Sequence, residues 1–201
     1  MSAPSDPATR AATHAEAQRD RILSAAQRCF VEHGFHAASM ANIAESSGMS
    51  AGLIYRYFHS KQEIILAIIE RQLDQRRADI ARLSHSSDLV AGAVDLFVQW
   101  RDADQRAALF LEMTAEASRN PQIAEALRKA DLVSRDDFRS WLTRSAEHGG
   151  LGLPNDLTEP RAIALQSLVE GLAIRAVREP DLDPETLRAA LAQVIPQLLS
   201  H

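Results

Sequence analysis

The side chains with the clearest chemical potential lie close together, where two tyrosines flank an arginine at Tyr55, Arg56 and Tyr57 and a Ser60-Lys61 pair follows. Hydroxyl, guanidinium and ammonium groups beside a helix N-terminus are the donors that hold a phosphate backbone in place. An ordinary solvated helix surface is the alternative interpretation. The combination favours a phosphate-contacting surface.

Catalytic and metal-binding patterns are not found elsewhere in the chain. The seven histidines are scattered, and the motifs of zinc hydrolases, serine hydrolases and nucleotide-binding loops do not occur. His33 and His36 are close in sequence, but no third or fourth ligand can be identified beside them. We therefore expect no enzyme activity, no metal and no cofactor.

The elements that position these donors are two short helices joined by a tight turn. Ser39 is placed to cap the first helix, Gly48 supplies the left-handed conformation that ends it, and Ser50 is placed to cap the second. Apolar residues give each helix an inward face: Met40, Ile43 and Ala44 in the first, and Leu53, Ile54 and Phe58 in the second. This layout is a helix-turn-helix, whose second helix enters the DNA major groove.

The same stretch, from about Arg19 to Leu66, resembles the TetR family of transcriptional regulators. The residues that carry the resemblance are Gly34-Phe35, Ser39-Met40, Ile43-Ala44, Ser47 to Gly52, Tyr55 to Phe58 and Ser60-Lys61. The resemblance implies phosphate contacts by Ser39, Tyr55, Tyr57 and Lys61, and a groove-facing set of Ser50, Ala51, Gly52, Leu53 and Arg56. Ala51 departs from the family pattern, which is often basic or polar there, so thymine methyl contacts and DNA shape are expected to carry more of the specificity.

Composition predicts an all-α fold, and the charge distribution bears on DNA binding. Of 201 residues, 46% are hydrophobic and only 5% aromatic, and Ala and Leu are abundant. The net charge of −5 has the wrong sign for a nucleic-acid binder, but the acidic excess falls entirely after residue 60. A DNA-binding domain without net charge predicts that each subunit binds DNA with modest, salt-sensitive affinity, so a dimer is needed for tight binding.

The expected organisation is a disordered tail at 1–12, a three-helix DNA-binding domain at 13–60, and a helical ligand-binding and dimerisation domain at 61–201. A capping box at Thr13 and Glu16 is expected to start the first helix, and Ser60 and Glu63 a second box that starts a long helix. Further helices are expected at 89–101, 105–118, from Asn120-Pro121 to 149–150, from Thr158, and from Asp183. Pro196 is expected to kink or shorten the last one.

The last two helices are the expected dimer interface. The helix that follows Pro160 is apolar on nearly every side, and such a helix needs burial on two faces. The resemblance places a four-helix dimer bundle here. The interface residues we expect are Leu168, Leu172, Ile174, Leu191, Val194 and Leu198.

Large apolar residues on the middle helices could line a ligand cavity, although most such residues form core. The candidate lining is Phe97, Trp100, Phe110, Met113, Glu116 and Trp141. Glu116, with Glu112 nearby, would suit a cationic ligand.

The sequence contains no apolar run long enough to span a bilayer, no signal peptide and a single cysteine, Cys29. We expect a cytoplasmic protein. The leading hypothesis is a ligand-responsive repressor that binds a palindromic DNA operator as a homodimer and responds to a small-molecule effector. The alternative is a helical enzyme or scaffold that retains a vestigial helix-turn-helix.

Overall fold

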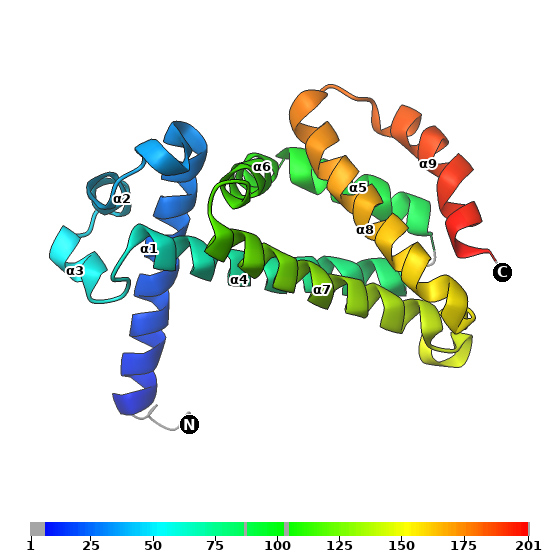
Figure 1. Cartoon of the computed structure of the whole chain (residues 1–201), viewed down its shortest axis with the longest axis horizontal. Coiled ribbons are helices and arrows are strands. Elements are labelled where there is room, and N and C mark those ends of the chain that lie inside the picture. The colour runs from blue at the N-terminus through cyan, green and yellow to red at the C-terminus, as the bar shows by residue number, and fades with distance from the viewer. Residues whose placement is uncertain (1–6, 87, 103–104, 201) are drawn as a thin grey trace, which may run out of the picture. The chain divides into compact units, whose positions relative to one another are not determined.

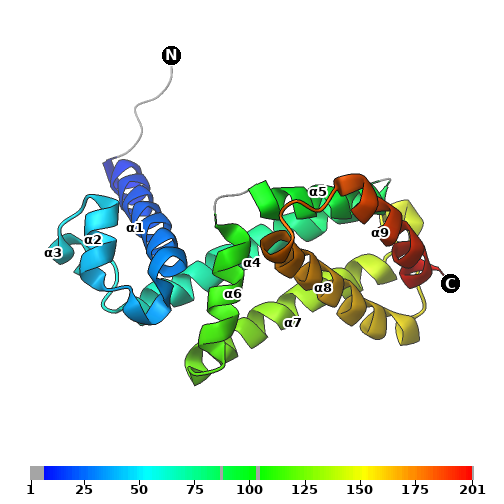
Figure 2. The same cartoon turned by 90° about the horizontal axis from the view of Figure 1, so that it is seen from above.

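The computed structural model describes residues 7–86, 88–102 and 105–200, with the side chains of residues 7–12 and of residue 85 left out, and this part of the chain is helical without a strand. It divides into two compact units, Met1–Ile68 and Ile69–His201 (Figures 1 and 2). The division falls inside α4 (Lys61–His85), so this helix contributes residues to both units. Within the described ranges, none of the helices has the length and apolarity to cross a membrane.

The first unit contains α1 (Pro7–Ala37), α2 (Met40–Ser47), α3 (Ala51–Tyr55) and the start of α4. Helix α1 begins at Pro7, so Thr13 lies inside the helix and is not its N-cap. The first six residues of the expected tail lie outside the described residues. The core of the unit is built from side chains that are almost completely buried: Ile22, Phe30, Ile43, Ile54, Phe58, Ile64, Ile65 and Ile68.

The end of α1 is shaped by Gly34. Its φ of 76° and ψ of 157° interrupt the helical conformation, and a last short turn follows, closed by a 3.1 Å hydrogen bond from the Ala38 amide to the Gly34 carbonyl. A positive φ suits glycine because it carries no Cβ. Gly34 is therefore the point where the regular path of α1 breaks.

The second unit contains the remainder of α4 followed by five further α-helices. They are α5 (Leu89–Asp102), α6 (Arg106–Ala117), α7 (Pro121–Thr143), α8 (Asn155–Arg178) and α9 (Pro184–Leu199), with a 3₁₀ turn at Ala146–His148. Helix α8 packs against α5, α6 and α7, and α9 packs against α5. One apolar cluster gathers around Phe97 and Trp100, and another around Phe138 and Trp141.

Three helix ends in this unit differ from the sequence-based expectation. Helix α7 ends at Thr143 and not at 149–150, because the chain turns back there and the Leu153 amide donates to the Leu142 carbonyl at 2.9 Å. Helix α8 begins at Asn155, and the buried Thr158 hydroxyl donates to the Asn155 carbonyl at 3.0 Å and caps nothing. Helix α9 continues past Pro196 to Leu199, so the proline does not end it early.

Charged pairs attach α4 to α6 and α7 within this unit. The α7 pairs are Arg76 with Asp131 at 2.7 Å and Arg77 with Asp137 at 2.9 Å. On the α6 side, Arg106 pairs with the carboxylate of Asp79, which is almost fully buried. Because a buried carboxylate is costly without a partner, the Arg106 pair also fixes the rotation of α4 at Asp79.

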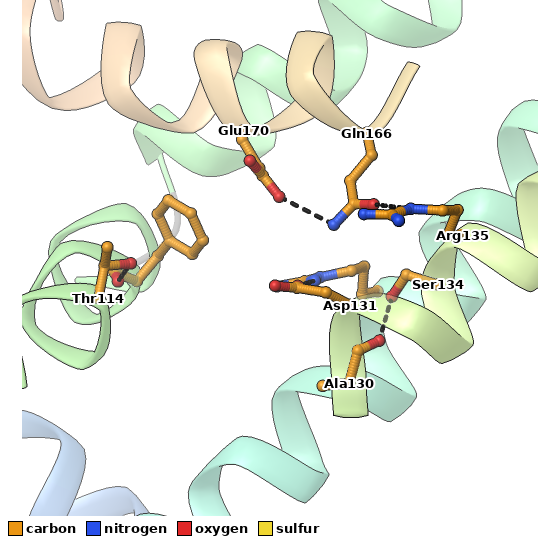
Figure 3. Close-up of polar contacts among 9 residues, drawn as sticks. Thr114, Ala130, Asp131, Ser134, Arg135, Gln166 and Glu170 are labelled. Atoms are coloured by element: carbon orange, nitrogen blue, oxygen red, sulfur yellow. Dashed lines mark hydrogen bonds and ion pairs between the residues drawn. The ribbon is translucent and has the colours of Figure 1, made fainter. Parts of the chain in front are cut away.

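A polar chain joins α7 and α8 (Figure 3). The Arg135 Nε donates to the Gln166 Oε1 at 3.3 Å, and the Gln166 Nε2 donates to the Glu170 Oε1 at 3.1 Å. Burial raises the pKa of Glu170, and the nearby Asp131 carboxylate adds to this, whereas the Gln166 hydrogen bond and nearby arginines oppose it. The protonated form of Glu170 is therefore favoured more in the folded state than in the unfolded chain.

This shift predicts a pH-dependent effect of Glu170→Gln. Because the pKa of Glu170 is higher in the folded state than in the unfolded chain, ionisation of this carboxyl at rising pH lowers the free energy of unfolding. The neutral amide does not ionise, so Glu170→Gln should raise the melting temperature at pH 7. The gain should vanish at pH values below the ordinary glutamate pKa of about 4.3. Thermal unfolding of both proteins across pH measures the difference. A gain that is equally large at low pH would show that burial of the charge is not its cause.

Candidate nucleic-acid interface and ligand cavity

A reciprocal cap fixes the start of α2. The Ser39 Oγ accepts from the Asn42 amide at 3.2 Å, and the Asn42 Oδ1 accepts from the Ser39 amide at 2.9 Å. The Ser39 hydroxyl also donates to the Asn42 Oδ1 at 2.5 Å. The predicted N-cap is confirmed. A phosphate contact by this hydroxyl requires its proton to turn away from Asn42, since phosphate only accepts.

The turn between α2 and α3 follows the predicted chemistry. Gly48 has a φ of 65°, and its amide donates to the carbonyls of Ala44 and Glu45. The Ser50 Oγ then accepts from the Leu53 amide at 3.3 Å and caps α3. The two caps confirm that helix, tight turn and second helix follow one another here as expected.

Helix α3 buries one side and exposes the other. Ile54 is fully buried, and Phe58 just beyond the helix is nearly so. Tyr55 is 48% exposed and Arg56 is also exposed. The remaining predicted DNA-contacting residues divide into exposed (Ser39, Ser50, Ala51 and Gly52) and half-buried (Leu53, Tyr57 and Lys61). Apart from Ser39, which caps α2, the exposed residues lie on α3 or at its two ends, and their contact with DNA stays a prediction.

Two arginines of α1 support this surface and were not identified from the sequence. The Arg19 Nη1 donates to the Tyr57 carbonyl at 3.3 Å, and its guanidinium lies 4.4 Å from the centroid of the Phe58 ring. The Arg28 Nη2 donates to the carbonyl and hydroxyl of Ser46, each at 3.2 Å. Partners so distant in sequence leave no local pattern that could reveal them.

Lys61 points into the first unit's own backbone. Its ammonium donates to the carbonyls of Phe35 at 2.5 Å, Ala38 at 2.8 Å and His36 at 3.2 Å, and it lies 4.5 Å from the centroid of the Phe35 ring. Phe35 and His36 lie in the last turn of α1, and Ala38 lies between α1 and α2. The geometry does not fit the phosphate contact that the resemblance implies for Lys61, because the ammonium donors are engaged.

The second unit contains a small cavity that is lined by residues of five helices, α4 to α8. Its lining residues are Arg76, Asp79, Ile80, Leu83, Leu96, Trp100, Phe110, Phe138, Gln166, Val169 and Glu170. Its volume of about 20 Å³ leaves room for roughly one water molecule. The Trp100 Nε1 is buried and has no hydrogen-bond partner among the described residues.

The structure brings only part of the predicted ligand-binding set to this cavity. Trp100 and Phe110 meet there edge to face, with ring centroids 5.7 Å apart. Phe97, Met113, Glu116 and Trp141 are buried but do not line it. The sequence analysis missed Phe138 of α7 and the polar side chains of α4 and α8, because helical periodicity does not show which faces of separate helices meet.

Titratable side chains give no indication of a metal site in the described ranges, where three or more His, Cys, Asp or Glu residues do not come together. Cys29 of α1 is free and buried.

The predicted dimer residues do not all face outward. Leu172 and Leu191 are buried in the core of their own subunit, which corrects the expectation that they form the interface. Leu168 and Leu198 are half-buried, whereas Ile174 and Val194 are exposed. Ile163 and Val177 of α8 are also exposed, and the sequence analysis did not select them. An apolar helix surface therefore remains on α8 and α9.

Comparison with known families assigns both parts of the chain. Residues 22–68 match the model of bacterial regulatory proteins of the TetR family, and residues 87–200 match the C-terminal domain of BetI-type transcriptional repressors. The first match covers the caps, the turn and α3. The second covers the cavity-lining residues of α5 to α8, but not those of α4, and it covers the outward apolar residues of α8 and α9.

Individual relatives agree with this assignment. The chain is 35% identical over 164 residues to the HTH-type transcriptional regulator UidR of Escherichia coli K12, covering 80% of this chain and 82% of the relative. It is 28% identical over 173 residues to the transcriptional activator FasR of Mycolicibacterium smegmatis, covering 77% and 78%. The solved structure of Salmonella enterica GusR superposes with a TM-score of 0.70 at 30% identity, covering 91% and 95%. The chain thus belongs to the TetR family of helix-turn-helix transcriptional regulators.

Proposed function

We propose that this chain is a cytoplasmic, homodimeric repressor that reads a palindromic operator through α3 and loses affinity for it when a small molecule binds in the second unit. The observation that carries the proposal is the exposed surface of α3, held by the Ser39, Gly48 and Ser50 caps and presenting Tyr55 and Arg56. Repression is favoured over activation because residues 87–200 match the BetI-type repressor domain.

The footprint on DNA tests this proposal most directly. The protein should protect a site with two-fold symmetry in the DNA upstream of its own gene, with half-site centres one helical turn of about 34–36 Å, or a multiple of it, apart. Arg56→Ala should reduce the sequence preference of that protection because it removes an exposed donor from α3. Protection without symmetry, or none, would contradict the proposal.

Gly52 offers evidence for a close approach of α3 to DNA. It lies in the first turn of α3, and a Cβ built there would meet no atom within 4 Å. The fold of this chain therefore does not require glycine at this position. A helix without a side chain at its groove-facing start lets its backbone come close to the bases.

The prediction is that Gly52→Ala separates stability from DNA binding. Alanine in a helix should stabilise the free protein by about 0.5–1 kcal/mol, because the added methyl meets open space. Operator affinity should fall by about tenfold, equivalent to about 1.4 kcal/mol. Thermal unfolding and operator titration measure the two effects. A variant that binds the operator as well as the parent would show that α3 does not approach DNA closely at residue 52.

The outward apolar residues of α8 and α9 support a homodimer. Ile163, Ile174 and Val177 of α8 and Val194 of α9 leave large apolar side chains uncovered in a single subunit. Burying such a surface against a second copy is favourable in proportion to its apolar area. Two reading units are also needed, because the first 60 residues carry no net charge and one unit alone binds DNA weakly.

Ile174→Glu should convert the dimer to monomers. Ile174 is 37% exposed in one subunit, so the change leaves the subunit core intact but places an unpaired charge in the proposed interface. Leu132→Glu on α7 is the matched control, because Leu132 is 46% exposed but lies outside α8 and α9. Sedimentation should show monomers for the first variant and dimers for the second. Dimers for both would place the interface elsewhere.

The effector part of the proposal rests on the cavity. Trp100 lines the cavity and carries a buried Nε1 donor without a partner among the described residues, and the polar side chains of Gln166 and Glu170 of α8 line the cavity as well. An organic ligand with an oxygen acceptor beside a flat apolar group fits this combination. Since the cavity now holds no more than about one water, the ligand must select a more open conformation. Coupling is reciprocal, so operator DNA must weaken this ligand by the factor by which the ligand weakens the operator.

A further inference from the structure

Lys61 is the first residue of α4, and its ammonium group is fully engaged by backbone oxygens. A lysine ammonium has three N–H donors, and three carbonyls, of Phe35, His36 and Ala38, accept from it at 2.5 to 3.2 Å. The ring of Phe35 adds a cation–π contact at 4.5 Å. A phosphate at this position would compete with all of these contacts.

The carbonyls that Lys61 binds lie in the last turn of α1 and the residues that lead to α2. Gly34 breaks α1 just before them, and Ser39, the N-cap of α2, follows Ala38 directly. The oxygens at a helix C-terminus carry partial negative charge and lack helical partners, so a cation satisfies both needs. Lys61 therefore ties the start of α4 to the residues that set where α2 begins.

We propose that Lys61 is a positioning residue for DNA reading, which holds the α1–α2 turn against the start of α4 and binds no phosphate itself. The inference rests on the proposed DNA-reading function. It departs from the phosphate contact that the family resemblance implies. The two roles predict different results because a phosphate ligand contributes equally to all DNA sequences, whereas a positioning residue contributes most where α3 must fit its operator.

The test compares Lys61→Met, which keeps the length and apolar stem but removes the charge, with Lys61→Arg, which keeps a cation able to donate and to stack on Phe35. For Lys61→Met, the ratio of operator to unrelated-DNA affinity should fall by about tenfold, while the salt slope stays unchanged. Lys61→Arg should restore most of that ratio. Amide hydrogen exchange of residues 38–42 in the free protein should become about tenfold faster in the Met variant, as expected when a charge-assisted hydrogen bond is lost.

The proposal is overturned if Lys61→Met weakens operator and unrelated DNA equally and lowers the salt slope by about one phosphate, or if exchange of the turn is unchanged. The exchange measurement needs no DNA. A protein that binds no operator would therefore refute the proposed function, while the exchange result would still decide whether Lys61 holds the turn. If Lys61→Met does not fold, Lys61→Gln takes its place in the same three measurements with the same expected outcomes, because its neutral amide has only two N–H donors for the three carbonyls.

Discussion

The contacts that orient α3 are the constraint on which the exposed surface of the first unit depends. A helix of five residues is too short to be stable alone, because nucleation costs more than its few hydrogen bonds return. It is held instead by the Ser50 cap at its start, by the fully buried Ile54, and by Arg19, which binds the Tyr57 carbonyl just beyond its end. The position of the exposed side of α3 thus depends on the buried residues and on the hydrogen bonds that hold this helix.

The same support explains how a unit without net charge can serve a DNA-binding protein. Arg19, Arg28 and Lys61 bind backbone oxygens within the unit. Cations used in this way contribute to rigidity and release few counterions from DNA, so the non-specific part of the affinity is small. Under the proposed function, recognition would then depend on the exposed groups of α3, on DNA shape and on the pairing of two DNA-binding units. A DNA-binding unit without net charge would lose non-specific affinity and so increase the ratio of operator affinity to non-specific affinity.

The sequence predicted the features that depend on near neighbours. The caps at Ser39, Ser50 and Asn120 are confirmed because each joins a side chain to an amide two or three residues away. The box at Ser60 is confirmed in one direction only, since the Glu63 carboxylate accepts from the His59 amide and not from that of Ser60.

Features that depend on how separate helices meet could not be read in this way. Leu172 faces the core and Ile174 faces outward, but a helix that is apolar on nearly every side gives no sign of its rotation. The cavity presents the same difficulty, because its wall draws residues from five helices. The engagement of Lys61 with residues more than 20 positions earlier was hidden for the same reason.

The composition of the cavity wall indicates how a ligand could act on α4. Arg76 and Asp79 both line the cavity, and both already pair with other helices, Arg76 with Asp131 of α7 and Asp79 with Arg106 of α6. Under the proposed function, a ligand that opens the cavity on its α4 side would change at least one of these pairs or move α4 with them. Leaving the buried Asp79 carboxylate without any partner would cost about 3–5 kcal/mol, which exceeds the roughly 1–3 kcal/mol typical of allosteric coupling, whereas the Arg76–Asp131 pair is partly exposed. A displacement of α4 that keeps these pairs intact would cost less free energy than breaking them. Helix α4 is also the element that contributes residues to both units.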